Sequence, residues 1–163
     1  QKIEDQKRKT QITLEEYQRK EQQRQALEAE RERLKNSHTQ VIIDQNRILV
    51  PVTFGHNGSE ITATMILDTG ASMTALHRSI AQQIQMPQGE RSMARVAGGG
   101  FLNTRSVTID YIRVGSKKWE YPTIMVIPEV GPRQYYDGLL GQDFLKRFSY
   151  TIDYAKSAIR WTP

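Results

Sequence analysis

The sequence predicts an all-β domain with short helices, preceded by a long N-terminal α-helix. The helix is indicated by residues 1–37, which contain no Gly or Pro although the 163-residue chain has 11 Gly and 6 Pro. The strands are indicated by short runs rich in β-branched and aromatic residues, which alternate with turn residues from Val41 onward. With 37% hydrophobic and 25% charged residues, the chain suits one modest domain and an appendage, and its strands are expected to form a small closed barrel.

Residues 1–37 form the first predicted unit, a charged helix. Strong helix formers, with Glu and Lys/Arg three and four residues apart, predict a solvated helix over "EEYQRKEQQRQALEAERERLK". Part of a coiled-coil seam is traced by Ile3, Thr10, Leu14 and Tyr17. Charged residues then interrupt it, and Leu27 and Leu34 resume it in a shifted register. Two interpretations stay open: a spacer helix without a fixed partner, and a weak dimeric coiled coil or docking helix.

The second predicted unit spans residues 48–163, after a linker or first strand at 38–47. Asn57-Gly58 separates two β-rich runs and predicts a type I′ hairpin, because both central positions of that turn need positive φ. Further strands are predicted in "SVTIDYIRVG", "KKWEYPTIMVI" and "SYTIDYAKSAIRW", the last with a turn at 155–157. Short helices are predicted at 77–85 and 142–148.

Composition excludes several classes of function. The net charge of +5 is spread evenly, with ten Lys/Arg against eight Asp/Glu in residues 1–40 and thirteen against ten in residues 41–163. Aromatic and basic residues do not alternate along any predicted strand, so nucleic acid is not an expected partner. The absence of Cys excludes disulfides, thiolate zinc sites and cysteine nucleophiles, and leaves the redox compartment undetermined.

The stretch "ILDTGAS" places a carboxylate at the end of an apolar run. A strand ending here would present Asp68 rigidly, while Gly70 would allow another chain to approach its backbone closely. The hydroxyl of Thr69 can hydrogen-bond inward, and that of Ser72 can donate to the carboxylate. Two such Asp residues sharing a proton would supply an acid and a base together. The alternative is a strand-end turn in which Asp68 only stabilises the backbone.

This stretch resembles the catalytic loop of the pepsin-like aspartic peptidases, and specifically the single-domain, retropepsin-like branch. The resemblance implies that Asp68 is catalytic and that Thr69 braces the two loops across a dimer interface. It implies that Ser72 hydrogen-bonds the aspartate, with Gly70 and Ala71 completing the loop.

Two further stretches carry the resemblance. "GLLGQDFLKRF" is similar to the family's late element, in which Leu139, Leu140 and Gly141 would cross behind the catalytic loop. "ARVAGGGFLNTRSVTID" resembles the glycine-rich flap of retroviral proteases. The implied flap and substrate-binding residues are Val96, Ala97, Gly98, Gly99, Gly100 and Phe101. An ordinary strand–turn–helix and a surface loop remain the respective alternatives.

A second catalytic carboxylate is missing from the chain. The other aspartates of the predicted body, none of which lies in an Asp-Thr-Gly context, are Asp44, Asp110, Asp137, Asp143 and Asp153. The second carboxylate is therefore expected from a second copy, in a symmetric homodimer that hydrolyses peptides or unfolded proteins. A preference for apolar side chains beside the scissile bond is suggested by Val96, Ala97, Phe101, Tyr135 and Tyr136.

Two alternatives to an aspartic peptidase stay open. A metal-dependent relative would use Asp68 and His77 as ligands. A third ligand is not evident, because His38 and His56 lie in linker-like or turn-like positions. No metal or other cofactor is therefore expected. The other alternative is a dimerisation or peptide-binding module, which would be catalytically silent.

A regulatory partner could bind the N-terminal helix, and the architecture resembles predicted bacterial envelope proteins. The chain begins with Gln, which suggests a processed or partial chain, so location stays open.

Overall fold

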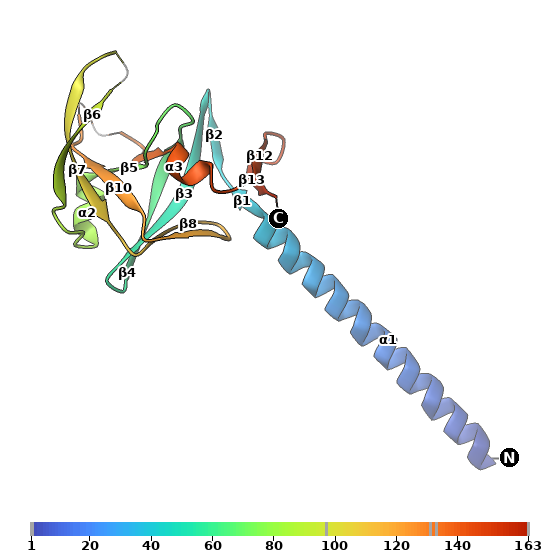
Figure 1. Ribbon diagram of the computed structural model, residues 1–163. Helices are drawn as coiled ribbons and strands as arrows, with labels where there is room; N and C mark the ends of the chain where they lie inside the picture. Colours follow the sequence, from blue (N-terminus) through green and yellow to red (C-terminus); the bar gives the residue numbers. More distant parts are fainter. Residues whose placement is uncertain (1, 97, 131, 133, 163) are drawn as a thin grey trace. The chain divides into compact units, whose positions relative to one another are not determined.

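The computed structural model describes residues 2–96, 98–130, 132 and 134–162. By the contacts between its residues, the chain divides into two compact units, residues 1–36 and 37–163. The first consists of one helix, and the second is mostly β-sheet with short helices, as predicted (Figure 1). None of the helices in the described ranges combines the length and the apolar character needed to cross a membrane.

Helix α1 spans Lys2–Ser37. The apolar side chains of α1 that the structure describes are exposed, including Leu14 at 55% and Leu27 at 71%. Charged side chains stabilise its surface locally, as where Arg24 donates to Glu21 over 2.6 Å. A helix with exposed apolar residues and no apolar stripe is stabilised mainly by propensity and such pairs. The coiled coil therefore remains a prediction.

The larger sheet of the body has ten strands. They are β2 (Ile42–Asp44), β3 (Arg47–His56), β4 (Ser59–Leu67), β5 (Ala75–His77), β6 (Glu90–Arg95), β7 (Phe101–Thr108), β8 (Tyr111–Val114), β9 (Lys117–Glu120), β10 (Thr123–Ile127) and β11 (Gly138–Leu140). Their order is β6-β7-β10-β5-β11-β4-β3-β8-β9, with β2 paired to β3 outside this path. Since β6 and β9 end the path in the described residues, the predicted closed barrel is not confirmed.

Local sequence signals explain two turns of the body. The predicted hairpin joins β3 and β4, and its turn residues Asn57 and Gly58 have φ of 48° and 76°. This agrees with the type I′ prediction, because both central residues have positive φ. The turn predicted at 155–157 is also present, between the last two strands of the chain.

The two short helices are shorter than predicted. Helix α2 spans Arg78–Gln83 and ends before Gln85, whose φ of 51° is not helical. Helix α3 spans Gln142–Leu145, so the prediction of a helix to residue 148 was wrong. The amides of Arg147 and Phe148 donate to the carbonyls of the residues three positions earlier, as in a tight turn rather than an α-helix. The ring of Phe148 packs 5.0 Å from that of Phe144 and 6.1 Å from that of Trp161.

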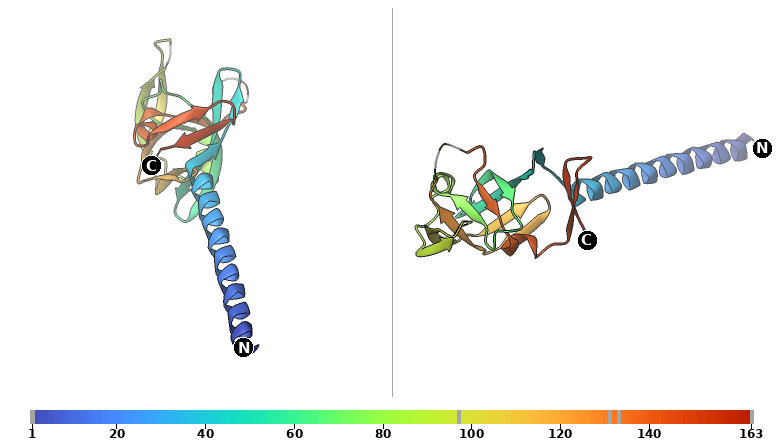
Figure 2. Two further views of the ribbon diagram at one scale, coloured as in Figure 1. Left: turned by 90° about the vertical axis from the view of Figure 1, so that its right-hand side faces the viewer. Right: turned by 90° about the horizontal axis from the view of Figure 1, so that it is seen from above.

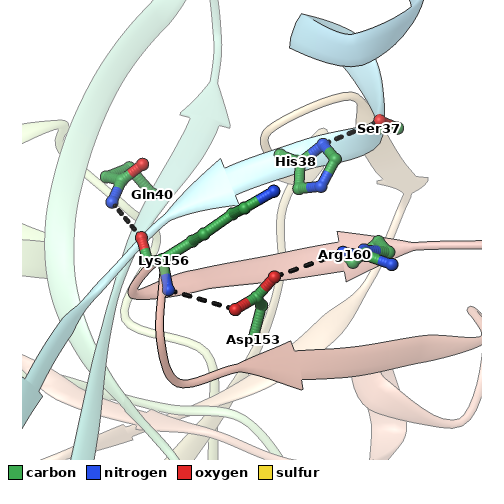
Figure 3. Close-up of polar contacts among 6 residues, drawn as sticks. All are labelled: Ser37, His38, Gln40, Asp153, Lys156 and Arg160. Atoms are coloured by element: carbon green, nitrogen blue, oxygen red, sulfur yellow. Dashed lines mark hydrogen bonds and ion pairs between the residues drawn. The ribbon is translucent and has the colours of Figure 1, made fainter.

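A smaller sheet joins the two ends of the body. Its order is β1-β13-β12, formed by β1 (His38–Gln40), β12 (Tyr150–Asp153) and β13 (Ala158–Trp161). On its polar face, Gln40 donates to the carbonyl of Lys156, and Asp153 accepts from the Lys156 amide and from Arg160 (Figure 3). These contacts close the hairpin between β12 and β13.

The hydrophobic core lies on one face of the central strands. Its fully buried side chains include Phe54, Met65, Leu76, Ile124 and Leu140. Neighbours in sequence point to the opposite face because side chains alternate along a strand. This alternation leaves a second face of the sheet outside the core, and the candidate site lies there.

Candidate functional site

Asp68 lies directly after β4, in the loop that leads to β5. Its amide donates to the carbonyl of Leu140 over 3.0 Å, which extends the parallel pairing of β4 and β11 by one residue. Its Oδ1 accepts from the amide of Gly70 over 2.8 Å. The strand pairing therefore fixes the Asp68 backbone, and the turn that follows orients its carboxylate, which is half-buried.

The sheet face around Asp68 is apolar but lies outside the core. Ile66, which precedes Asp68 by two residues, pairs with Leu139, and Leu139 also pairs with Ala75 of β5. Ala75 pairs in turn with Met125 of β10. Ile66, Leu139 and Met125 are half-buried and do not belong to the core cluster. An apolar strip thus extends from Asp68 across four neighbouring strands, β4, β11, β5 and β10, and forms a surface suited to an extended peptide.

The other predicted loop residues surround Asp68 at the surface. Thr69, Gly70 and Ser72 are exposed, and Ala71 is half-buried. The hydrogen bond to the Asp68 carboxylate in the described residues comes from the Gly70 amide rather than from the Ser72 hydroxyl. Exposed Thr69 and Gly70 leave this loop accessible to a second chain.

Helix α3 supports the loop from behind. The amides of Gln142 and Asp143 donate to the carbonyls of Ala71 and Ser72, over 2.8 and 3.2 Å. The Asp143 carboxylate accepts from both the amide and the hydroxyl of Thr74, over 2.8 and 2.7 Å. The sequence pattern predicts only that Asp143 lies at the start of a short helix. The signal available in the sequence was that Gln142 and Asp143 directly follow the "GLLG" motif, which was expected to cross behind the loop.

The backbone at Gly141 passes close to the loop that follows Asp68. A Cβ built on Gly141 would lie 2.5 Å from the carbonyl carbon of Met73 and 2.9 Å from the amide nitrogen of Thr74. Only a residue without a side chain permits that approach. The structure thus brings Leu140 and Gly141 of the predicted late element directly against the loop that holds Asp68.

The glycine-rich stretch forms a hairpin tip. Strands β6 and β7 pair from Glu90 to Arg95, and the hairpin projects from the strands around it (Figures 1 and 2). Val96 closes the tip by donating to the carbonyl of Gly100 over 2.9 Å. Gly98 and Gly99 have φ of 95° and 89°, which glycine adopts readily. Phe101 is 70% exposed, and the predicted residue Ala97 lies outside the described residues.

A cavity of about 590 Å³ adjoins the apolar strip. Leu139 belongs to the strip and also lines the cavity, together with Leu102 of β7 and Tyr136. His77 lies 5.8 Å from the ring of Tyr136. Glu129 lines the cavity too, and hydrogen bonds from the side chain and the backbone of Ser79 lower the pKa of its carboxyl group.

Tyr135 and Tyr136 contact a cation from β3. Arg47 donates to the hydroxyl of Tyr135 over 2.7 Å, and its guanidinium lies 5.9 Å from the centre of each ring. The hydrogen bond to Tyr135 raises the pKa of Arg47. Tyr135 is 54% exposed, so it presents both apolar and polar surface at this end of the body.

In the described part of the chain there is no group of three or more His, Asp or Glu side chains that could hold a metal ion. His77 faces Tyr136, and its amide donates to the carbonyl of Asp137 over 2.8 Å.

Comparisons with known proteins identify a family whose model matches most of the β-rich body. A family model described as aspartyl protease matches residues 50–144. Two similar solved structures are a retropepsin-like aspartic protease from Rickettsia conorii and the retroviral protease-like domain of Ddi1 from Leishmania major. The Rickettsia protein is 19% identical with a TM-score of 0.49, and the match covers 76% of this chain and 86% of the Rickettsia chain. The Leishmania domain is 17% identical with a TM-score of 0.49, and the match covers 74% of this chain and 97% of the Leishmania chain. A comparison with curated proteins gave no match.

Proposed function

Because the chain belongs to the aspartyl protease family, we propose that it is an aspartic endopeptidase whose active site forms between the Asp68 residues of two copies. The observation that carries this proposal is the setting of Asp68. Its carboxylate is held by the Gly70 amide at the end of a strand and lies beside an apolar sheet face outside the core. Membership of the family supports the prediction made from the Asp-Thr-Gly stretch.

The proposed reaction needs two carboxylates close together. Like charges at short range favour a state in which one proton is shared, so one Asp68 is ionised and the other is protonated. The ionised carboxylate takes a proton from a water molecule, which attacks the scissile carbonyl carbon. The protonated carboxyl group donates to the carbonyl oxygen, and the C–N bond then breaks as the nitrogen accepts a proton.

A homodimer is the simplest source of the second carboxylate. A twofold axis beside the exposed loop at Thr69 and Gly70 would place each Asp68 opposite its own image. Pairing of α1 between the two copies would raise the effective concentration of the two half-sites without a new contact in the site.

Substrate would bind as an extended strand between the apolar strip and the β6–β7 hairpin. The glycine tip at 98–100 would serve as a flap that closes over the peptide and offers backbone hydrogen bonds. Ile66 and Leu139 on the strip favour apolar side chains next to the scissile bond. A bound peptide inhibitor in a compact rather than an extended conformation would contradict this mode of binding.

The direct test is cleavage of a peptide library derived from an unfolded proteome, from about pH 4 to about pH 8. Mass spectrometry of the products should show internal cleavage with apolar residues beside the cut. Peptides that bind the protein but remain intact at every pH would instead indicate a catalytically silent binding module.

We expect activity to depend on dimer formation. Below the dimer dissociation constant, specific activity should fall about twofold for each twofold dilution, because both carboxylates must come together. Sedimentation velocity on the same dilutions should show the dimer disappearing in parallel. A monomer that retains full specific activity would contradict the shared site.

A further inference from the structure

The peptide group between Thr69 and Gly70 has a hydrogen-bond partner on each side. Its N–H, from Gly70, donates to Oδ1 of Asp68 over 2.8 Å. Its carbonyl oxygen, from Thr69, accepts from the side-chain amide of Gln142 over 3.1 Å. A carbonyl oxygen can only accept, so the NH₂ group of Gln142 must face it. A chain of hydrogen bonds therefore runs from Gln142 through one peptide group to the Asp68 carboxylate.

Gln142 is held firmly enough to orient that peptide group. Its own amide donates to the carbonyl of Ala71 over 2.8 Å, and it is the first residue of α3. The next residue, Asp143, is bonded twice to Thr74 at the far end of the same loop. The Gln142 side chain thus extends from a backbone that is bonded to the middle and the far end of the loop, while Thr69 and Gly70 are exposed.

We infer that Gln142 is a positioning residue, which sets the orientation and donor strength of the Gly70 amide that holds Asp68. The peptide group is planar, so fixing its carbonyl fixes the direction of its N–H. A donor on the carbonyl oxygen also polarises the amide and strengthens the hydrogen bond on the other side. The consequence for catalysis depends on the proposed role of Asp68, whereas the consequence for the Gly70 amide does not.

The first test observes the Gly70 amide by ¹H–¹⁵N NMR in the full chain. Gln142→Met keeps the length of the side chain but has no donor, and Gln142→Arg restores a donor. With Met, the Gly70 proton should shift upfield and its exchange with solvent should become about tenfold faster, as expected for a weakened hydrogen bond. With Arg, both values should return toward those of the unaltered protein.

The second test uses kinetics with the same variants. Gln142→Met should lower kcat about tenfold and change KM less than about twofold, since the side chain acts on the carboxylate rather than on bound peptide. Gln142→Arg should recover most of the loss, and thermal denaturation should confirm that both variants remain folded. A structural role alone would change the melting temperature without a donor-specific rescue.

Two results would overturn the inference. One is a Gly70 amide unaffected by Gln142→Met, and the other is an amide that responds while kcat does not. Unaltered protein that cleaves no peptide would instead count against the proposed endopeptidase. In that case the NMR measurement still decides whether Gln142 controls the Gly70 amide, so the two failures are distinguishable.

Discussion

Replacing Asp68 with Asn is expected to abolish peptide cleavage while leaving the fold intact. The amide of Asn has nearly the same shape as the carboxyl group, and its oxygen can still accept from the Gly70 amide, which bonds to Oδ1 in the structure. It cannot take a proton from water at any pH in the assay. General acid–base groups contribute about 10²- to 10⁴-fold to rate, so a loss of about 10³-fold or more is expected.

The matched control is Asp110→Asn. Asp110 accepts from the amide of Asn57 at the β3–β4 turn, and the side-chain oxygen of Asn can accept that bond as well. The substitution therefore removes the same charge at a position with no proposed part in catalysis. The Asp110→Asn variant should retain cleavage. Mass spectrometry of the products should therefore detect cleavage by Asp110→Asn and none by Asp68→Asn. Cleavage by Asp68→Asn at the same rate as by Asp110→Asn would refute the proposed chemistry.

The same variant also tests whether the site is shared. Mixing unaltered protein with about a ninefold excess of Asp68→Asn, followed by time for subunit exchange, should lower its activity about tenfold by random pairing. An equal excess of Asp110→Asn should cause no such inhibition. If the Asp68→Asn chain fails to inhibit at concentrations where dimers exist, each chain must carry a complete site.

Gly141→Ala is expected to destabilise the body and displace the loop that holds Asp68. The new methyl group would lie 2.5 Å from the backbone carbon of Met73, and backbone cannot give way as a flexible side chain can. Overpacking of this kind costs about 1–3 kcal/mol, and the upper end is expected here. In a domain of this size, that corresponds to a fall in melting temperature of about 10 °C. Thermal denaturation measures the effect directly.

The control for this substitution is Gly100→Ala. A Cβ on Gly100 would meet only a methyl of Val96, at 3.5 Å, which is ordinary contact. Its melting temperature should stay within about 2 °C of the unaltered protein, since ordinary surface substitutions change stability by less than about 0.5 kcal/mol. Equal melting temperatures for Gly141→Ala and Gly100→Ala would contradict the close packing described for Gly141.

The sequence by itself determined the features that depend on residues close together along the chain. Composition separated the charged helix from the β-rich body, because Gly and Pro disfavour a helix interior. The Asn57-Gly58 turn followed from the positive φ that both positions require. The end of the apolar run at Leu67 placed a carboxylate directly after a strand, and the Asp-Thr-Gly stretch resembled a catalytic loop before any contact was known.

Only the tertiary structure decided which distant segments support that loop. The sequence marked Leu140 and Gly141 as a motif through a family resemblance, but not the hydrogen bond from the Asp68 amide to Leu140. Nor did it indicate that Gln142 reaches the Thr69 carbonyl, or that α3 ends at Leu145. Periodicity and turn propensities report backbone conformation over a few residues. Strand register, close backbone approach and side-chain partners far along the chain depend on how the elements pack, and local patterns do not encode that packing.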